Sequence, residues 1–203
     1  MHFTLELYSR FLRATVTPRR YRHSTDVMNV MADLSAIYTL DTTQAMTAGL
    51  LHDAARDLPF ADLLRLAHEA HLVLVHPSEE HPIYLHAPVG AYLVGKELGV
   101  CDNAVTEAIA AHSHVDPPGG SDGVLLHCLR VADVLAPIRE WKGMKRLESM
   151  VYLGCLEEAA LLHAGWLLEH FEQEGIPIHP HLVDTVQRLS AKLSVTESFF
   201  ERW

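Results

Sequence analysis

The sequence has few cysteines, only three in 203 residues. Cys101, Cys128 and Cys155 stand far apart and form no C-x-x-C pair. An odd number of scattered cysteines argues against a disulfide framework and against a zinc site built from thiolates. We therefore expect a reducing compartment and predict that each cysteine is a small, buried or half-buried apolar side chain.

Basic residues and long apolar runs are also scarce. Sixteen Lys and Arg against 26 Asp and Glu give a formal net charge of -10. This charge has the wrong sign for general binding to nucleic acid or to an anionic membrane surface, so neither partner is expected. No run of about 18 apolar residues occurs, and charged residues interrupt the N-terminal segment MHFTLELYSRFLR. These absences favour a soluble cytoplasmic protein.

Apolar residues recur at helical spacing in almost every segment. Val27, Met31 and Leu34 fall on one face of a helix with 3.6 residues per turn. Asp41 offers N-cap chemistry for the next helix, and Pro and Gly residues at 116–121 form the strongest loop signal. We predict an all-α protein, a single helical bundle, in which only residues 72–75 are compatible with a strand. The expected helices include residues 61–70, 124–138, 148–174 and 180–193.

Histidine is abundant, with 15 residues, and it is the commonest side-chain ligand of transition metals. The sharpest local feature is His52-Asp53 at the end of an apolar helical segment. Adjacent residues point about 100° apart on a helix, so both reach one metal only if it lies at the helix edge. A hydrogen-bonded His-Asp pair is the alternative interpretation of these two residues.

Further metal-capable residues open or close other expected helices, and Asp133 lies inside one, all in apolar surroundings. Asp133 lies among Val131, Ala132, Val134 and Leu135, where an ionised carboxylate is costly unless a cation or hydrogen-bond donors neutralise it. Imidazole and carboxylate ligands without thiolate suit iron or manganese better than a structural zinc ion. The candidate ligands in chain order are His23, His52, Asp53, His86, His112 and Asp133.

The order H…HD…H…H…D and its flanking residues resemble the HD-domain superfamily of metal-dependent phosphohydrolases. The similarity extends to its YqeK branch, bacterial symmetrical dinucleoside-tetraphosphate hydrolases, and covers residues 20–195. We therefore assign residues 1–19 to an N-terminal helical extension, 20–195 to an HD domain and 196–203 to a C-terminal tail. The matching segments are RYRHS (20–24), AGLLHD (48–53), DLP (57–59), LHAPVGA (85–91), AI (108–109), AD (132–133) and IPIHP (176–180).

The resemblance implies an enzyme with two divalent metal ions between the helices. It assigns His23, His52, Asp53 and Asp133 to one ion and His86 and His112 to the other, with Asp53 bridging. Iron is the metal implied, with manganese or another transition metal as alternatives. The implied reaction is cleavage of diadenosine tetraphosphate into two ADP by a metal-activated water. Another nucleotide substrate (mono-, di- or triphosphate), a catalytically silent nucleotide-binding module and a structural metal cage remain alternatives.

A tetraphosphate needs local positive charge in a protein of net charge -10. Arg20, Arg56 and Arg139 are the candidates for phosphate binding, and Arg56 is also a candidate catalytic residue because it follows Asp53 by three residues. In the resembling family, Lys is common at the position of Arg56, and Arg139 stands at the arginine of an E-P-x-R segment. Exposed, carboxylate-paired arginines are the alternative for each.

The sequence departs from the family pattern beside the predicted metal ligands. Ser113-His114-Val115-Asp116 follows His112, where the family has H-T-T-G, and Ala136 replaces an acidic residue. His114 is a candidate catalytic residue: it could protonate the leaving phosphate, replace a threonine that positions it, or face solvent. We expect most of the remaining histidines at the surface or at helix caps. The aromatic C-terminus needs a packing partner within the chain or across a homodimer.

Overall fold

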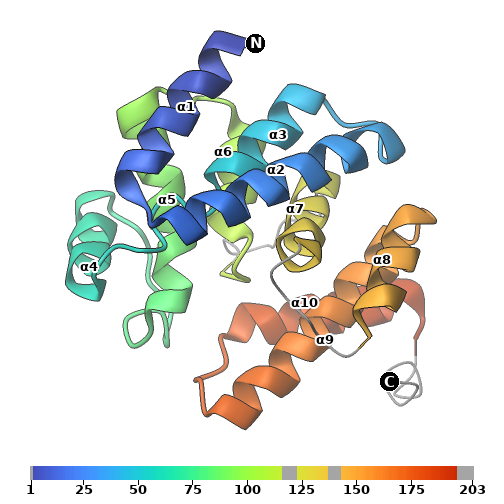
Figure 1. The fold of residues 1–203 in the computed structure, drawn as a ribbon. Helices are drawn as coiled ribbons and strands as arrows, with labels where there is room; N and C mark the ends of the chain where they lie inside the picture. Colours follow the sequence, from blue (N-terminus) through green and yellow to red (C-terminus); the bar gives the residue numbers. More distant parts are fainter. Residues whose placement is uncertain (1, 116–122, 137–142, 196–203) are drawn as a thin grey trace.

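Ten helices and no strand form in the residues that the computed structural model describes, 2–115, 123–136 and 143–195. The prediction of an all-α protein is confirmed (Figure 1). None of the described helices is long and apolar enough to cross a membrane. The helices are α1 (His2–Thr15), α2 (Pro18–Ile37), α3 (Thr42–Leu51), α4 (Phe60–Glu69), α5 (Pro82–Leu98), α6 (Asn103–Ala111), α7 (Val124–Leu135), α8 (Met144–Tyr152), α9 (Leu156–Glu174) and α10 (Pro180–Leu193).

Side-chain caps fix the starts of several helices. Asp41 accepts a hydrogen bond from the backbone N–H of Gln44 at the start of α3, as predicted, and Asp102 does the same for Val105 at the start of α6. Helix α3 ends one residue before His52, and α6 ends one residue before His112. The caps fix where each helix begins, and each predicted metal ligand follows the last residue of its helix.

Two predicted helices have different limits in the structure. The expected helix 148–174 is wrong as one element: α8 and α9 are separated at Gly154, whose φ of +88° is accessible to glycine. The helix expected over 124–138 ends at Leu135, because Ala136 precedes a proline and has the extended ψ of 135°. Residues 72–75 form neither strand nor helix. The predicted loop 116–121 lies outside the described residues.

The largest core cluster is built mainly from α1, α2, α3, α6 and α7. Leu12, Met31, Leu50, Ile109 and Leu129 are fully buried in it. Helix α7 contacts α2, α3 and α6 on one side and α8 and α9 on the other (Figure 1). This position of α7 brings the ends of α3 and α6 into the same region of the molecule as α9.

Helices α2 and α3 approach each other closely at Gly49. A Cβ at this position would lie 2.9 Å from the Cα of Met28 and 3.0 Å from the Cγ of Met31. The Gly49→Ala variant is expected to lower the free energy of unfolding by about 1–3 kcal/mol. The added Cβ would clash with the Met28 backbone, which cannot move aside as a flexible side chain can. Chemical denaturation measures the change.

Gly95→Ala is the matched control for this prediction. Its Cβ would meet only the carbonyl oxygen of Val100, which follows α5, at 3.5 Å, an ordinary van der Waals contact. We expect the control to be neutral or stabilised by about 0.5–1 kcal/mol, since alanine restricts the unfolded chain more than glycine. Equal stability of the two variants would contradict close packing at Gly49.

Candidate metal centre

Five helices bring the six predicted metal ligands together. His23 projects from α2, His86 from α5 and Asp133 from α7, whereas the other three follow the C-terminal ends of α3 and α6. The Nε2 of His23 lies 2.7 Å from Oδ1 of Asp133, and the Nε2 atoms of His86 and His112 lie 3.1 Å apart. Sequence positions from 23 to 133 thus converge on one site.

Asp53 connects two groups of candidate ligands. Its Oδ2 lies 3.4 Å from His52 and 3.9 Å from His23, measured to Nε2. Its Oδ1 lies 3.4 Å from His86 and 3.8 Å from His112, again measured to Nε2. Within each group the ligand atoms lie within 4.8 Å of one another. A carboxylate whose two oxygens face different histidines has the arrangement that a bridging metal ligand needs.

Backbone hydrogen bonds orient two of the histidines for metal binding. The Nδ1–H of His52 donates to the Gly49 carbonyl at 2.8 Å, and the Nδ1–H of His112 donates to the Ile109 carbonyl at 2.7 Å. Each ring therefore turns Nε2 towards Asp53, and the buried Nε2 of His52 makes no hydrogen bond within the described chain. Such second hydrogen bonds are typical of histidines that ligate metals, so these residues fit a divalent cation.

The electrostatics of the site also suit a cation. Burial alone would lower the pKa of His52, but the Asp53 and Asp133 carboxylates raise it to about 10. Burial would raise the pKa of Asp53, yet His52 and His86 hold it well below its usual range. Burial, reinforced by charge on His86 and His52, lowers the pKa of His112 to about 3. An ionised Asp53 and a neutral His112 are in the states that metal ligands require, whereas His52 must release its proton when a cation binds.

The predicted phosphate-binding arginines have different positions. Arg20 donates from Nη1 to Oδ2 of Asp53 at 2.7 Å, and its Nε lies 3.8 Å from Asp57. Arg56 lines the same pocket as Asp53 and His86. Arg139 lies outside the described residues. The pairing of Arg20 with carboxylates was the alternative to phosphate contact, and it occurs in this structure.

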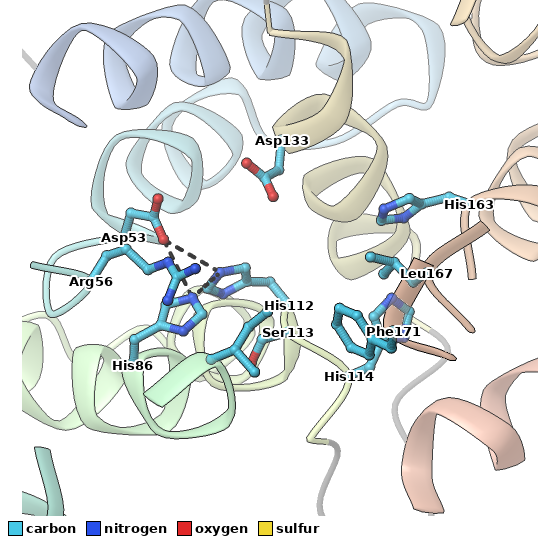
Figure 2. Close-up of a pocket in the computed structure, with 11 residues that line it drawn as sticks. Asp53, Arg56, His86, His112, Ser113, His114, Asp133, His163, Leu167 and Phe171 are labelled. Carbon is cyan, nitrogen blue, oxygen red and sulfur yellow. Dashed lines mark hydrogen bonds and ion pairs between the residues drawn. The ribbon is translucent and has the colours of Figure 1, made fainter. Parts of the chain in front are cut away.

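A pocket that is partly open to solvent adjoins the metal-ligand cluster. Figure 2 shows Asp53, Arg56, His86 and His112 at one end of this pocket and His163, Leu167 and Phe171 at the other. Sequence reasoning did not find the second end, because a helical apolar pattern in α9 indicates burial without saying against what. The lining residues are Asp53, Arg56, Ile83, His86, His112, Ser113, His114, Asp133, His163, Leu167 and Phe171.

Several expectations for residues outside the ligand set are wrong. His114 does not face solvent: its side chain is buried, with 2% of the residue exposed, because α9 packs over the turn after α6. Most of the remaining histidines lie at the surface or at helix caps, as expected, but His127 and His163 are buried. His179 does cap α10, accepting from the backbone N–H of His181. Cys101 is exposed, contrary to expectation, whereas Cys128 is buried and Cys155 is half-buried.

Comparisons with known proteins agree with this geometry. A protein of Bacillus subtilis named "Bis(5'-nucleosyl)-tetraphosphatase, symmetrical" is 30% identical over 141 residues, which are 68% of this chain and 73% of that protein. A protein of Halalkalibacterium halodurans with the same name is 26% identical over 183 residues, 89% of this chain and 94% of that protein.

A solved structure and a family model extend the agreement to the fold. The crystal structure of a Clostridium acetobutylicum protein, described as a predicted HD superfamily hydrolase involved in NAD metabolism, matches with a TM-score of 0.86 and 26% identity. The match covers 93% of this chain and 97% of that chain. The HD domain model matches residues 20–138, which hold all six candidate ligands. The resemblance found in the sequence is confirmed, and the chain belongs to the HD domain family.

Proposed function

We propose that this protein is a metal-dependent phosphohydrolase that cleaves diadenosine tetraphosphate symmetrically into two ADP. The observation that carries the proposal is the Asp53 carboxylate, whose two oxygens face two separate pairs of buried histidines. The relatives from Bacillus subtilis and Halalkalibacterium halodurans, both named symmetrical bis(5'-nucleosyl)-tetraphosphatases, support the substrate.

The candidate ligands divide into two sets around Asp53. His23, His52, Asp53 and Asp133 would hold one divalent ion, and His86 and His112 would hold the other together with Asp53. A bound pair of such ions lowers the pKa of a water molecule and stabilises the charge that develops on phosphate oxygens. We propose iron as the native metal, with manganese as the alternative, because all six ligands are imidazoles or carboxylates.

We propose that three arginines and His114 bind and orient the substrate. Arg56 supplies a guanidinium beside Asp53 and His86, where it would pair with phosphate oxygens. Arg20 holds the Asp53 carboxylate in place through its 2.7 Å contact, and further N–H groups of its guanidinium would contact a phosphate. Arg139 and His114 complete the set of residues that we propose to contact the substrate.

The test of this function is the analysis of products formed from diadenosine tetraphosphate. Protein loaded anaerobically with iron, or with manganese, is expected to form ADP as the only product, and metal-stripped protein is expected to be inactive. Equal amounts of ATP and AMP would contradict symmetrical cleavage. If the metal-loaded protein hydrolyses a nucleoside mono-, di- or triphosphate and leaves diadenosine tetraphosphate intact, the alternative substrates are favoured. Full metal occupancy without any hydrolysis would favour a silent nucleotide-binding module or a structural metal cage.

Arg56→Ala is expected to lower kcat/KM for diadenosine tetraphosphate by about 10- to 100-fold, since a hydrogen bond to a charged group is worth about 1.5–3 kcal/mol. Metal content should not change, because Arg56 is not among the candidate ligands. Arg65→Ala is the control: Arg65 is exposed on α4 and pairs with Asp62 and Glu69. Steady-state kinetics and metal analysis are measured for both variants. Unchanged kinetics for Arg56→Ala would contradict phosphate binding by Arg56 and favour an exposed, carboxylate-paired arginine.

The proposal extends to the cellular location, the domain limits and the oligomeric state of the protein. We propose that the protein acts in the cytoplasm, with residues 20–195 as the HD domain and residues 1–19 and 196–203 as extensions. A homodimer would cover the aromatic C-terminus, which lies outside the described residues. Light scattering after size-exclusion chromatography measures the oligomeric state.

A further inference from the structure

The pocket beside the metal-ligand cluster has two chemically different ends. Asp53, Arg56 and His112 form a charged and polar end, whereas Leu167 and Phe171 form an apolar end (Figure 2). Ile83 also lines the pocket and packs against the same buried cluster as Leu167. A ligand that fills the whole pocket must therefore carry charge at one end and a dehydrated apolar group at the other. Inorganic phosphates satisfy only the first requirement.

The apolar end rests on a buried cluster with members from α5, α9 and α10. Phe171 belongs to a buried cluster with Tyr84, Ala164 and Leu182, and Leu167 packs against this cluster. The Phe171 and Tyr84 rings meet edge to face with their centroids 6.2 Å apart, a favourable arrangement for aromatic rings. The surface offered to a ligand is thus formed before the ligand binds.

His114 is a polar group at this apolar end. The residue is 2% exposed and lines the pocket, and its ring centroid lies 5.8 Å from that of His163. Both of its ring nitrogens are buried and make no hydrogen bond to the described residues. Buried polar atoms without partners are costly, and such atoms in a pocket wall are typical of groups that pair with a ligand.

His114 also has a left-handed backbone conformation. Its φ of +60° costs free energy for a residue other than glycine. Thr39, His71 and Ser194 share this conformation, so the backbone at His114 does not by itself indicate a function. The unpaired ring nitrogens in the pocket wall carry the argument.

We propose that Ile83, Leu167 and Phe171 hold a nucleobase of the substrate, and that His114 hydrogen-bonds the edge of this base and selects it. This inference rests on the proposed function, which places the phosphates at Arg56 and the metal-ligand cluster. A nucleobase has apolar faces for the leucine and the phenylalanine and polar edges for a histidine. An imidazole ring carries one donor and one acceptor, and the adenine edge offers an amino donor and ring-nitrogen acceptors.

The apolar contact is tested with two adjacent leucines of α9. Leu167 and Leu168 are both half-buried and both pack against the Phe171 cluster, but only Leu167 lines the pocket. Calorimetry with manganese-loaded protein measures the affinities of ADP and of pyrophosphate, which has no base. Leu167→Ala is expected to weaken ADP about tenfold, through lost apolar contact, and to leave pyrophosphate unchanged. Leu168→Ala is expected to leave both affinities unchanged.

The role of His114 is tested with two histidines that share a left-handed backbone. His71 has a φ of +53° and is exposed, so His71→Gly controls for the relief of strain in His114→Gly. We expect His114→Gly to weaken ADP about tenfold, to leave pyrophosphate unchanged and to reduce the preference for ADP over UDP. His71→Gly is expected to bind all three ligands as the parent protein does.

The outcomes separate this inference from the proposed function. If the parent protein converts diadenosine tetraphosphate to ADP but both pocket variants bind ADP normally, the base site is wrong and the function stands. Equal weakening of ADP and pyrophosphate would also overturn the base site, because it would place Leu167 and His114 at the phosphates or in folding. If the parent protein binds pyrophosphate but not ADP, both the base site and the nucleotide substrate are wrong.

Discussion

Replacement of Asp53 by asparagine is expected to lower kcat/KM for diadenosine tetraphosphate by at least about 100-fold, since several kcal/mol of transition-state stabilisation is lost. The physical reason lies in the contacts of the carboxylate. Oδ1 faces His86 and His112 and Oδ2 faces His52 and His23, so one neutral amide would weaken both groups of ligands at once. Asparagine keeps the size of the side chain, so the change tests charge and ligation rather than packing.

Metal analysis by mass spectrometry distinguishes this effect from misfolding. Asp53→Asn is expected to bind less metal than the parent protein while keeping its helical circular dichroism spectrum. Asp62→Asn is the control, because Asp62 is an exposed carboxylate on α4 that pairs with Arg65. The control should keep both metal and activity. An Asp53→Asn variant with full activity and full metal content would rule out Asp53 as a bridging ligand.

The positions of the metal ligands could be predicted because local rules determine them. His52 and His112 directly follow apolar helices with Asp caps, so the helix register that presents them is visible in the sequence. Asp133 is conspicuous because a carboxylate in an apolar helix needs a cation or donors. His23 and His86 could be identified as ligands only from the order of all six residues, since a single histidine is compatible with many other roles.

The apolar end of the pocket could not be predicted because it depends on tertiary packing. Leu167 and Phe171 belong to α9, and their helical pattern is the same whether they pack on a core or line a pocket. His114 stands beside a loop signal, so a solvent-facing position was a reasonable but wrong expectation. The break between α8 and α9 was missed for a similar reason, since apolar periodicity continues on both sides of Gly154.

Removal of the metal is expected to destabilise the folded protein as well as to stop catalysis. Ligands that bind only the folded state stabilise it by about 2.7 kcal/mol at a free concentration 100 times Kd. For a chain of 203 residues this corresponds to a shift in Tm of about 5–10 °C for one filled site. The candidate ligands come from α2, α5, α7 and the ends of α3 and α6, so metal binding ties together helices that are far apart in the sequence.

Scanning calorimetry of metal-stripped protein, titrated with manganese, measures this shift. The same titration of Asp53→Asn should give a smaller shift, because the variant retains only part of each ligand group. A normal shift in Tm together with no hydrolysis of any nucleotide would identify a structural metal cage. A protein that gains activity on metal addition without any shift in Tm would instead contradict metal binding by this interhelical cluster. We expect stability and turnover to rise together over the same range of metal concentrations, because the same six side chains would serve both.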